Sequence, residues 1–396
     1  MGLLGLLLFL ALATAVGGKK TLHHFPWRIV LGGLILQVVL LFLLRVHPGV
    51  YNLLQKVFSV LSEAAFQGGR AAFGQNVHIG AVFVLNCTVT FIFISAIMGL
   101  LYYWGIPQFI IKQLTKFLRF ALGIGGLSAT LATINVIFGM GEACTIVNPY
   151  IPTMSPFTFF VMCVSGLSTI SLALIVFIAG LGIPAGDLVT AVILSAPASL
   201  VFASLLEPPK ADEAQSEIKL EADVFKSDSA LESFANGAIS GLKLSFTVIA
   251  VFIATVATVW LVNYFLGLPH RFWLAIPELS LQKIIGYPGA LFALLMGVPA
   301  SEALKVGYLL GCNLCLNEVI SFTELLKIQE MLSPRSVRIA TFALTGFANF
   351  TSLGILYSIV ECFAPERKGE LRRLLWKALM GGVLASYSSA CLASLF

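Results

Sequence analysis

The sequence predicts an all-α integral membrane protein, and three observations support this fold class. Of the 396 residues, 58% are hydrophobic and only 11% are charged, whereas soluble domains carry about 25% charged residues. Apolar runs close to the roughly 20 residues that cross a bilayer recur along the chain, and the length allows about eight to eleven such elements. Short basic patches at 112–119 and 368–377 lie between apolar runs, which is typical of membrane-interface anchors and makes nucleic acid an unexpected partner.

The first 120 residues are expected to form spans joined by helices at the membrane surface. Lys19 and Lys20 follow the first apolar run, whereas a signal peptide carries its charge before that run, so we expect a short first span. Apolar residues recur at helical spacing against Gln55, Lys56 and Glu63, which favours a helix lying in the interface. The expected spans are 2–17, 28–46 and 79–104, and the expected surface helices are 49–72 and 106–120.

Two later segments are moderately apolar but interrupted by glycine, proline and asparagine, which a continuous spanning helix would not contain. The first covers 122–152 and includes Glu142, and the second covers 281–328 and includes Glu318. Backbone that leaves a helix inside a bilayer is tolerated only where protein or a water-filled cavity satisfies its N–H and C=O groups. We therefore expect both segments to line a cavity.

The interrupted segments occupy corresponding places in two halves of the chain. Glu142 is followed after 24 residues by a cluster of small and hydroxyl residues that begins at Gly166, and Glu318 is followed after 28 residues by one that begins at Gly346. Paired interrupted segments at matching positions indicate the binding site of a secondary transporter. The sequence therefore predicts a transporter in which one structural unit is used twice.

Carboxylates support the same prediction. An ionised glutamate near the bilayer centre costs at least about 2.5 kcal/mol, so such residues usually face a partner or a pathway. We expect Glu142 and Glu318 to face the pathway, and the alternative is an interfacial or structural role. Glu302, and Glu324 near Lys327, are expected to be solvated or capping residues.

Other kinds of chemistry are weakly supported. Cys312 and Cys315 have the spacing of half a metal site or of a redox pair, but no second pair or nearby histidine accompanies them. We interpret both as small apolar helix residues. An intramembrane enzyme using Glu142 and Glu318 as acid and base is a further alternative, yet the chain has no HExxH or GxSxG motif. We therefore expect no enzyme activity and no organic cofactor.

Several long motifs occur in a fixed order. They are NVIFGMGEACTIVNPYIP (135–152), LSAPASLVFASLLEPP (194–209), MGVPASEALKVGYLLGCNLCLNEVISF (296–322), GFANFTSLGI (346–355) and APERKGELRRLLWKALMGG (364–382). With them the sequence resembles the concentrative nucleoside transporter family, whose signatures include G-Q-S/T-E-A, MGVP, LNEF and GFANFSSIGI. The resemblance extends from about residue 85 to the C-terminus.

The resemblance implies a homotrimer in which each protomer has eight transmembrane helices and two re-entrant helical hairpins arranged as an inverted repeat. It also implies a multi-pass protein of the cell membrane, the inner membrane in a bacterium. The expected regions are 1–120, N-terminal spans with the interfacial and scaffold helices; 121–206, a first transport repeat with hairpin 122–152, broken span 157–183 and span 187–205; 207–237, a polar loop rich in acidic residues; 238–280, a long scaffold span and connector; and 281–396, a second transport repeat with hairpin 281–328, broken span 336–361 and span 375–396.

The resemblance also implies a nucleoside site between the two hairpins. Glu318, Asn349 and Ser352 match the positions that hold the ribose hydroxyls. A carboxylate and an amide suit vicinal hydroxyls because each accepts from an O–H and the amide also donates. Phe347 matches an aromatic position in the broken helix, and the base is expected to face the first hairpin. The residues expected there are Met140, Gly141 and Glu142.

At two of these positions the chain departs from its family. Where the family has Gln and then Ser or Thr, this chain has Met140 and Gly141, which offer no side-chain amide or hydroxyl to the base edge. Ribose recognition is expected to be intact, and we infer a relaxed or shifted base preference or a nucleoside-like substrate.

The coupling ion is left open between sodium and a proton. By resemblance, a sodium site would take side-chain oxygens from Asn135 and Thr169 and backbone carbonyls from Phe138 and Ile170. This all-oxygen set suits a hard cation, and sodium is slightly favoured. The expected function is cation-coupled uptake of nucleosides by a symporter. The alternative is an uncoupled nucleoside gate, channel or sensor with the same fold.

Overall fold

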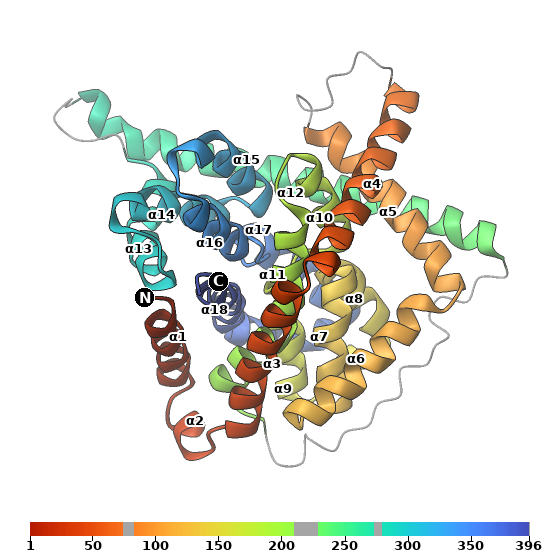
Figure 1. Cartoon of the computed structure of the whole chain (residues 1–396), viewed down its shortest axis with the longest axis horizontal. Coiled ribbons are helices and arrows are strands. Elements are labelled where there is room, and N and C mark those ends of the chain that lie inside the picture. Colours follow the sequence, from red (N-terminus) through yellow and green to blue (C-terminus); the bar gives the residue numbers. More distant parts are fainter. Residues whose placement is uncertain (74–82, 210–228, 273–278, 396) are drawn as a thin grey trace.

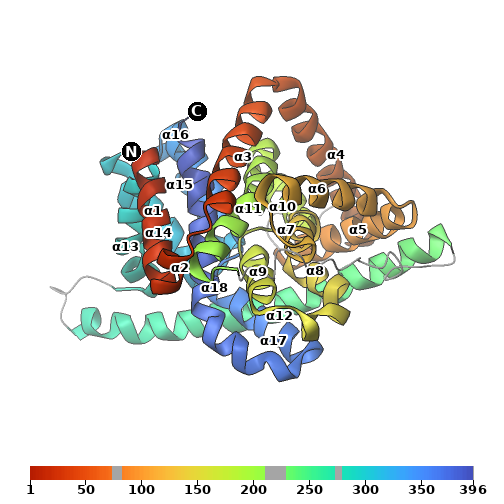
Figure 2. The ribbon, with the colours of Figure 1, turned by 90° about the horizontal axis from the view of Figure 1, so that it is seen from below.

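The computed structural model describes residues 1–73, 83–209, 229–272 and 279–395. Figure 1 shows that these residues form a bundle of helices, and no strand occurs among them. This agrees with the all-α fold class. The first and last helices pack against each other, so the two termini lie close together in both views (Figures 1 and 2).

The described part of the first 122 residues forms the helices that precede the first interrupted segment. The expected surface helix α4 is amphipathic, with the exposed Val50, Leu53 and Val57 on one side. Helix α6 follows α5 after a 78° bend, which Gly105 permits because it adopts a left-handed conformation. These helices are α1 (Gly2–Gly17), α2 (Lys19–His23), α3 (Trp27–Val46), α4 (Pro48–Phe73), α5 (Phe83–Tyr103) and α6 (Ile106–Leu122). Residues 79–82 of the expected span 79–104 lie outside the described residues.

Helices of the first half are broken where glycine and hydroxyl residues interrupt the sequence. Helix α7 ends at Gly139, whose φ of 77° is readily adopted only by glycine. The helix that follows Ser155 ends before Ser168, and the next begins after Ser171, whose side chain accepts from Leu174 N–H. The helices are α7 (Gly126–Phe138), α8 (Met140–Val147), the 3₁₀ helix η2 (Asn148–Thr153), α9 (Pro156–Leu167), α10 (Leu172–Gly180) and α11 (Ala185–Leu206).

The second half shows the same kind of breaks. Gly297 ends one helix with a φ of 101°, and Pro299 precedes the next. The expected hairpin 281–328 therefore contains three helices rather than two. The helices are α12 (Ala230–Phe272), α13 (Leu281–Met296), α14 (Ala300–Cys315), α15 (Glu318–Ile328), the 3₁₀ helix η5 (Gln329–Met331), α16 (Pro334–Leu344), α17 (Phe350–Phe363), the 3₁₀ helix η6 (Pro365–Arg367) and α18 (Lys368–Ala393).

Two boundaries differ from the expected ones. Helix α12 begins at Ala230, inside the expected polar loop 207–237. Ser229 caps this end by accepting from Glu232 N–H at 3.1 Å, in the Ser-x-x-Glu pattern of a capping box. Residues 210–228 of that loop, and 273–278 of the connector, lie outside the described residues. Helix α18 begins at Lys368, seven residues before the expected span, because its basic first turns remain helical.

The core is built around α11 and the α9–α10 pair. In these stretches 94% and 89% of the residues are buried, whereas only 11% of the long apolar stretch of α12 is buried. Figure 2 shows α12 running along the outside of the bundle. The chain therefore has one set of apolar helices enclosed by protein and one long apolar helix that faces outward.

By length and composition, four stretches of the described residues are long and apolar enough to cross a membrane. The bent pair of α5 and α6 would add a fifth. This count is below the expected eight because other apolar helices, such as α1 and α17, have only 16 and 14 residues. The four stretches are Trp27–Leu44, Pro156–Gly180, Ala185–Leu206 and Ala230–His270.

Candidate functional site

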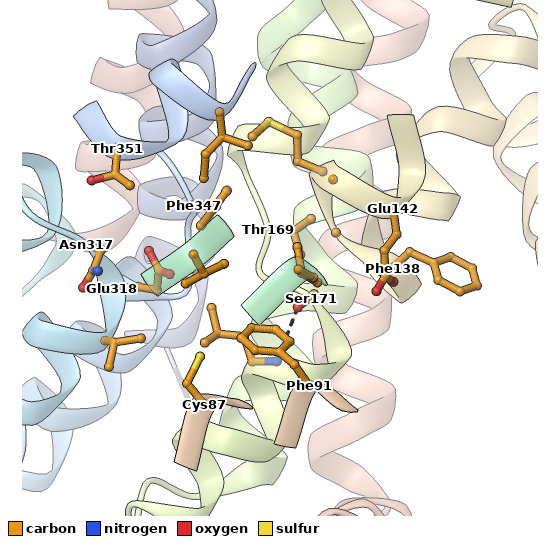
Figure 3. Close-up of a pocket in the computed structure, with 18 residues that line it drawn as sticks. Cys87, Phe91, Phe138, Glu142, Thr169, Ser171, Asn317, Glu318, Phe347 and Thr351 are labelled. Atoms are coloured by element: carbon orange, nitrogen blue, oxygen red, sulfur yellow. Dashed lines mark hydrogen bonds between the residues drawn. The ribbon is translucent and has the colours of Figure 1, made fainter. Parts of the chain in front are cut away.

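A cavity with an empty volume of about 800 Å³, partly open to solvent, lies where the helix breaks meet. Figure 3 shows Glu318 and Glu142 on opposite sides of the cavity, with Thr169 and Ser171 between them. The lining comes from both halves of the chain and from α5 and α12. Its residues are Cys87, Phe91, Phe138–Glu142, Thr169, Ser171, Leu174, Leu244, Val248, Asn317–Val319, Phe347, Thr351 and Ile355.

Glu318 is held firmly on the second-half side of the cavity. It is 4% exposed, and Asn349 Nδ2 donates to its Oε2 at 2.9 Å. Asn349 Oδ1 in turn accepts from the backbone N–H and the Oγ of Ser352, both at 2.8 Å. A hydrogen bond to a charged acceptor is roughly twice as strong as a neutral one. The chain Ser352–Asn349–Glu318 therefore fixes the carboxylate before any ligand arrives.

Two asparagines position these groups by capping short helices. Asn317 Oδ1 accepts from Ile320 N–H at 3.0 Å and begins α15, which places Glu318 in the first turn. Asn349 caps α17 in the same way. Both helices therefore direct N-terminal partial positive charge toward the carboxylate region.

Glu142 is held more loosely on the first-half side. Ser95 on α5 donates through its Oγ to Glu142 Oε1 at 3.4 Å, at the long end of the hydrogen-bond range. The glutamate lies in the first turn of α8. A Cβ on the preceding Gly139 would come within 2.7 Å of Ser171 Cβ, so the break that directs Glu142 requires glycine both for its φ and for space.

The two unusual residues beside Glu142 differ in their surroundings. Met140 is 2% exposed, and its side chain packs against Gly166, where a Cβ would lie 2.7 Å from Met140 Cγ. A Cβ on Gly141 would instead meet only Leu244 Cδ1, at 3.8 Å. Met140 thus fills space between α8 and α9, whereas Gly141 leaves room at the cavity wall.

The upper part of the cavity in Figure 3 is formed around the break between α16 and α17. Phe347 lies in this break and lines the cavity. Thr351, in the first turn of α17, donates through Oγ1 to the backbone oxygen of Leu316 at 2.9 Å. Leu316 lies in the break between α14 and α15, so this hydroxyl satisfies a carbonyl that the interrupted helix leaves free.

A second group of oxygens gathers at the end of α7 and the break between α9 and α10. Asn135 is fully buried; its Nδ2 donates to Leu131 O and to Ser165 Oγ, both at 2.9 Å. Its Oδ1 has no hydrogen-bond partner among the residues that the structure describes, which is costly for a buried amide oxygen. Phe138, at the end of α7, and Thr169, in the break, both line the cavity. Ile170 is buried beside Thr169.

This second group suits a cation by its donor chemistry. It combines an unpartnered amide oxygen, a hydroxyl and carbonyls at two helix ends, and oxygen ligands are those that hard cations prefer. Helix C-termini add partial negative charge. Thr169 Oγ1 donates to Ile170 O at 3.3 Å, which leaves lone pairs on both oxygens.

The structure brings most of the predicted site residues together. Met140, Gly141, Glu142, Glu318 and Phe347 line one cavity. Asn349 and Ser352 lie behind Glu318 rather than in the lining, so their contact with a ligand stays a prediction. Of the predicted ion ligands, Phe138 and Thr169 line the cavity, and Asn135 and Ile170 are buried next to it.

The sequence did not predict that α5 and α12 form one wall of the cavity. Cys87 and Phe91 come from α5, and Leu244 and Val248 come from α12. These residues lie in long uniform apolar helices, so no break or charge distinguished them. The spacing of Cys87 and Phe91 by one helical turn is the only local signal.

Other side chains singled out in the sequence lie elsewhere. Cys312 and Cys315 are buried free thiols, and within the described ranges no group of three His, Cys, Asp or Glu residues has metal-binding geometry. Glu302 accepts from Ser333 N–H and Oγ, and thereby joins the starts of α14 and α16. Glu324 pairs with Lys327 at 2.7 Å on the exposed side of α15.

Comparison with known proteins shows that this chain is similar to nucleoside transporters. Residues 187–394 match the model of the family described as "Na+ dependent nucleoside transporter C-terminus". An uncharacterized transporter of Haemophilus influenzae is 31% identical over all of this chain and 97% of its own length. The nucleoside permease NupC of Helicobacter pylori is 32% identical, with 80% of this chain and 76% of that protein covered.

Solved structures of a similar transporter have the same fold as this chain. CNTnw in an inward-facing substrate-bound state superposes with a TM-score of 0.90 and 28% identity, over 100% of this chain and 96% of that one. A doubly substituted form of the same protein in an outward-facing state also gives a TM-score of 0.90. The relatives are transporters and permeases rather than enzymes, and their fold and apolar helices are those of a multi-pass membrane protein. The chain therefore belongs to the concentrative nucleoside transporter family.

Proposed function

We propose that this protein is a cation-coupled symporter that takes up nucleosides across the bacterial inner membrane. The observation that best supports the proposal is the position of Glu142 and Glu318, which come from corresponding interrupted segments and lie on opposite sides of one cavity. Carboxylates enclosed by an apolar protein face a partner or a pathway. The bacterial relatives support the proposed location.

The ribose would bind at Glu318. A carboxylate has about four acceptor positions, and Asn349 occupies one of them, so vicinal hydroxyls can donate to the others. Asn349 and Ser352 hold the carboxylate in place, and each would contact the sugar only after a small movement of α17. The fixed geometry lowers the cost of ordering the site when the substrate binds.

The base would lie toward Glu142 and Gly141, with Phe347 beside it. Phe347 offers an aromatic face for stacking, which is tolerant of base identity. Met140 and Gly141 present no polar side-chain atom, so readout of the base edge would rest on Glu142 and on backbone groups. We therefore propose a broad base preference.

The coupling ion would bind at the oxygen group around Asn135, and sodium is the favoured ion. The unpartnered Asn135 Oδ1, the Thr169 hydroxyl and the carbonyls of Phe138 and Ile170 form an all-oxygen set. Phe138 is adjacent to the Gly139 break that directs Glu142. Binding of the ion would order this break and raise nucleoside affinity, and the reciprocal effect follows from linkage.

Transport would proceed by movement of the two repeats, 121–206 and 281–396, against the scaffold formed by 1–120 and 238–280. The cavity lies between these parts, because α5 and α12 supply one wall and the broken helices supply the others. The outward-facing apolar surface of α12 would contact the lipid bilayer and neighbouring copies in a homotrimer.

Uptake of radiolabelled uridine and adenosine in a transport-deficient bacterial strain tests this function. Wild type and Glu318→Gln are compared at equal membrane abundance, with sodium and pH varied separately. The proposal predicts accumulation by the wild type, loss in the variant, and dependence on sodium at fixed pH. Uptake that depends on pH but not on sodium would indicate that the coupling ion is a proton. Flux that follows the nucleoside gradient and ignores both ions would favour the uncoupled gate.

A further inference from the structure

An open pocket with a basic lining lies apart from the nucleoside cavity, between the start of α3 and the end of α6. It is lined by Arg28, Lys116, Arg119, Phe120, Gly123 and Ile124, and is called the basic pocket below. The two helices are in contact with each other. Three cationic side chains therefore converge from two elements that are about 90 residues apart in the sequence.

Acidic residues are scarce in the N-terminal part of the sequence that forms the basic pocket. Residues 1–122 contain nine lysines and arginines and one carboxylate, Glu63. Glu63 lies on α4 and is engaged by Gln67 and Arg70. In the described part of the chain, no carboxylate lies within ion-pair distance of Arg28 or Lys116. Arg28 and Lys116 therefore offer positive charge that an external anion can neutralise.

Backbone geometry keeps the basic pocket open. Gly123 ends α6 in the left-handed region with a φ of 66°. A Cβ at this position would lie 2.6 Å from Arg28 Nε, so glycine makes room for the guanidinium. Arg28 Nη2 donates to Phe120 O at 3.0 Å, which uses one of the five donors of the guanidinium. Arg28 is thereby fixed in the pocket while it retains donors for an anion.

The surroundings of the basic pocket are those of a membrane interface. Helix α6 turns 78° away from the apolar α5, as expected for a helix that lies along the surface. Its Phe109, Phe117 and Phe120 are 64%, 49% and 82% exposed, which fits the apolar face of an interfacial helix. Trp27, 64% exposed beside Arg28, begins an apolar stretch long enough to span the bilayer, where aromatic residues mark the interface.

We propose that the basic pocket binds the phosphate headgroup of an anionic phospholipid. Arg28 and Lys116 would contact the phosphate, since basic pockets between helices at the headgroup level bind such lipids. The exposed phenylalanines of α6 would contact the acyl chains. The lipid would join the end of α6 to the start of α3, two elements that do not contribute to the nucleoside cavity.

Binding of a fluorescent phosphatidylglycerol to the purified full-length protein in a neutral detergent tests this site. The variants are Lys116→Gln, the double change Arg28→Gln with Lys116→Gln, and Lys112→Gln as a control. Lys112 is an exposed lysine on the same helix that does not line the pocket. Each charge removed from the pocket should weaken binding about fivefold, so the double variant should lose about 25-fold. Lys112→Gln should bind like the wild type.

Three results would overturn the proposal. An equal loss in Lys112→Gln and Lys116→Gln would show diffuse surface attraction instead of a pocket. Equal binding of phosphatidylcholine would show that the headgroup charge is not recognised. Displacement of phosphatidylglycerol by a similar concentration of inorganic phosphate would show a site for a free anion rather than a lipid. The single variant Lys116→Gln keeps the test valid if loss of Arg28 disturbs the end of α6.

Discussion

The two carboxylates of the cavity are held in different ways. Glu318 is 4% exposed and accepts from Asn349 at 2.9 Å within its own half of the chain. Glu142 is partly exposed and accepts at 3.4 Å from Ser95, which belongs to the scaffold helix α5. The second half therefore presents a preorganised acceptor, whereas the first half presents an acceptor whose position depends on how α8 sits against α5.

This difference indicates that the second half fixes the substrate and that the first half responds to it. A preorganised group contributes affinity at little ordering cost, and a loosely held group beside a cation site is free to move when the ion binds. We therefore expect substitutions behind Glu318 to weaken nucleoside binding, substitutions near Asn135 to change ion dependence, and substitutions near Glu142 to change selectivity.

The largest effect is expected for Asn349→Asp. The aspartate retains an acceptor for the α17 cap but removes the N–H donor to Glu318 and places two carboxylates together. Loss of a hydrogen bond to a charged group costs about 1.5–3 kcal/mol, so nucleoside affinity should fall by about 10- to 100-fold, as measured by equilibrium binding. Asn313→Asp is the control, because it buries a carboxylate that does not contact Glu318. An equal loss of nucleoside affinity in both variants would show that the hydrogen bond from Asn349 to Glu318 is not specifically required.

Asn135→Ala should change the ion dependence while the nucleoside cavity remains intact. The variant removes the unpartnered Oδ1, and we expect the sodium concentration for half-maximal uptake to rise about tenfold, the effect of losing one charge-assisted contact. Thr133→Ala, which removes a buried hydroxyl bonded to Ala129 O on the same helix, should leave it unchanged. An unaltered sodium dependence in Asn135→Ala would place the ion elsewhere.

Gly141→Ser should alter base preference. A Cβ fits at this position, with Leu244 as its nearest neighbour at 3.8 Å, and the hydroxyl adds a hydrogen-bonding group at the cavity wall. One such bond contributes about 0.5–1.5 kcal/mol, so the ratio of uridine to adenosine uptake should shift by a few-fold. Gly141→Ala supplies the same Cβ without the hydroxyl. If the alanine variant shifts the ratio equally, shape rather than hydrogen bonding sets the preference.

Ser95→Ala should have the smallest effect. The bond from Ser95 to Glu142 is long, and its loss should change nucleoside affinity by less than about threefold, since weak neutral donors contribute at the low end of the range. Ser245→Ala, which removes a hydroxyl bonded to Leu242 O on α12, sets the baseline for a change on a scaffold helix. If Ser95→Ala lowered nucleoside affinity as much as Asn349→Asp, the two carboxylates would not differ in how firmly they are held.

Much of the fold could be predicted because its breaks have sequence signals. Gly139, Pro299 and Asn317 mark helix ends by their backbone preferences, and the structure breaks the helices there. The start of α12 was missed although Ser229 and Glu232 form a capping box, because the charge of the polar stretch outweighed that local pattern. Hydropathy reports burial from water and carries no information on which apolar helices pack together.

The candidate site was predicted only in part for the same reason. Glu142 and Glu318 were identifiable because a carboxylate in an apolar segment is rare. Leu244 and Val248 were not, because they resemble every other residue of α12. The role of Asn349 also depends on tertiary structure, since only the packing of α17 against α15 shows that its amide donates to Glu318.

Nucleoside binding to purified protein, with Glu318→Gln compared with Glu324→Gln, tests whether Glu318 binds the substrate. Both glutamates lie on α15, but Glu324 is on the exposed side and pairs with Lys327. At saturating sodium, Glu318→Gln should lower uridine affinity by about 100-fold, as expected for a charged acceptor of the ribose hydroxyls. Glu324→Gln should bind like the wild type. Equal affinity in wild type and a correctly folded Glu318→Gln would contradict the account.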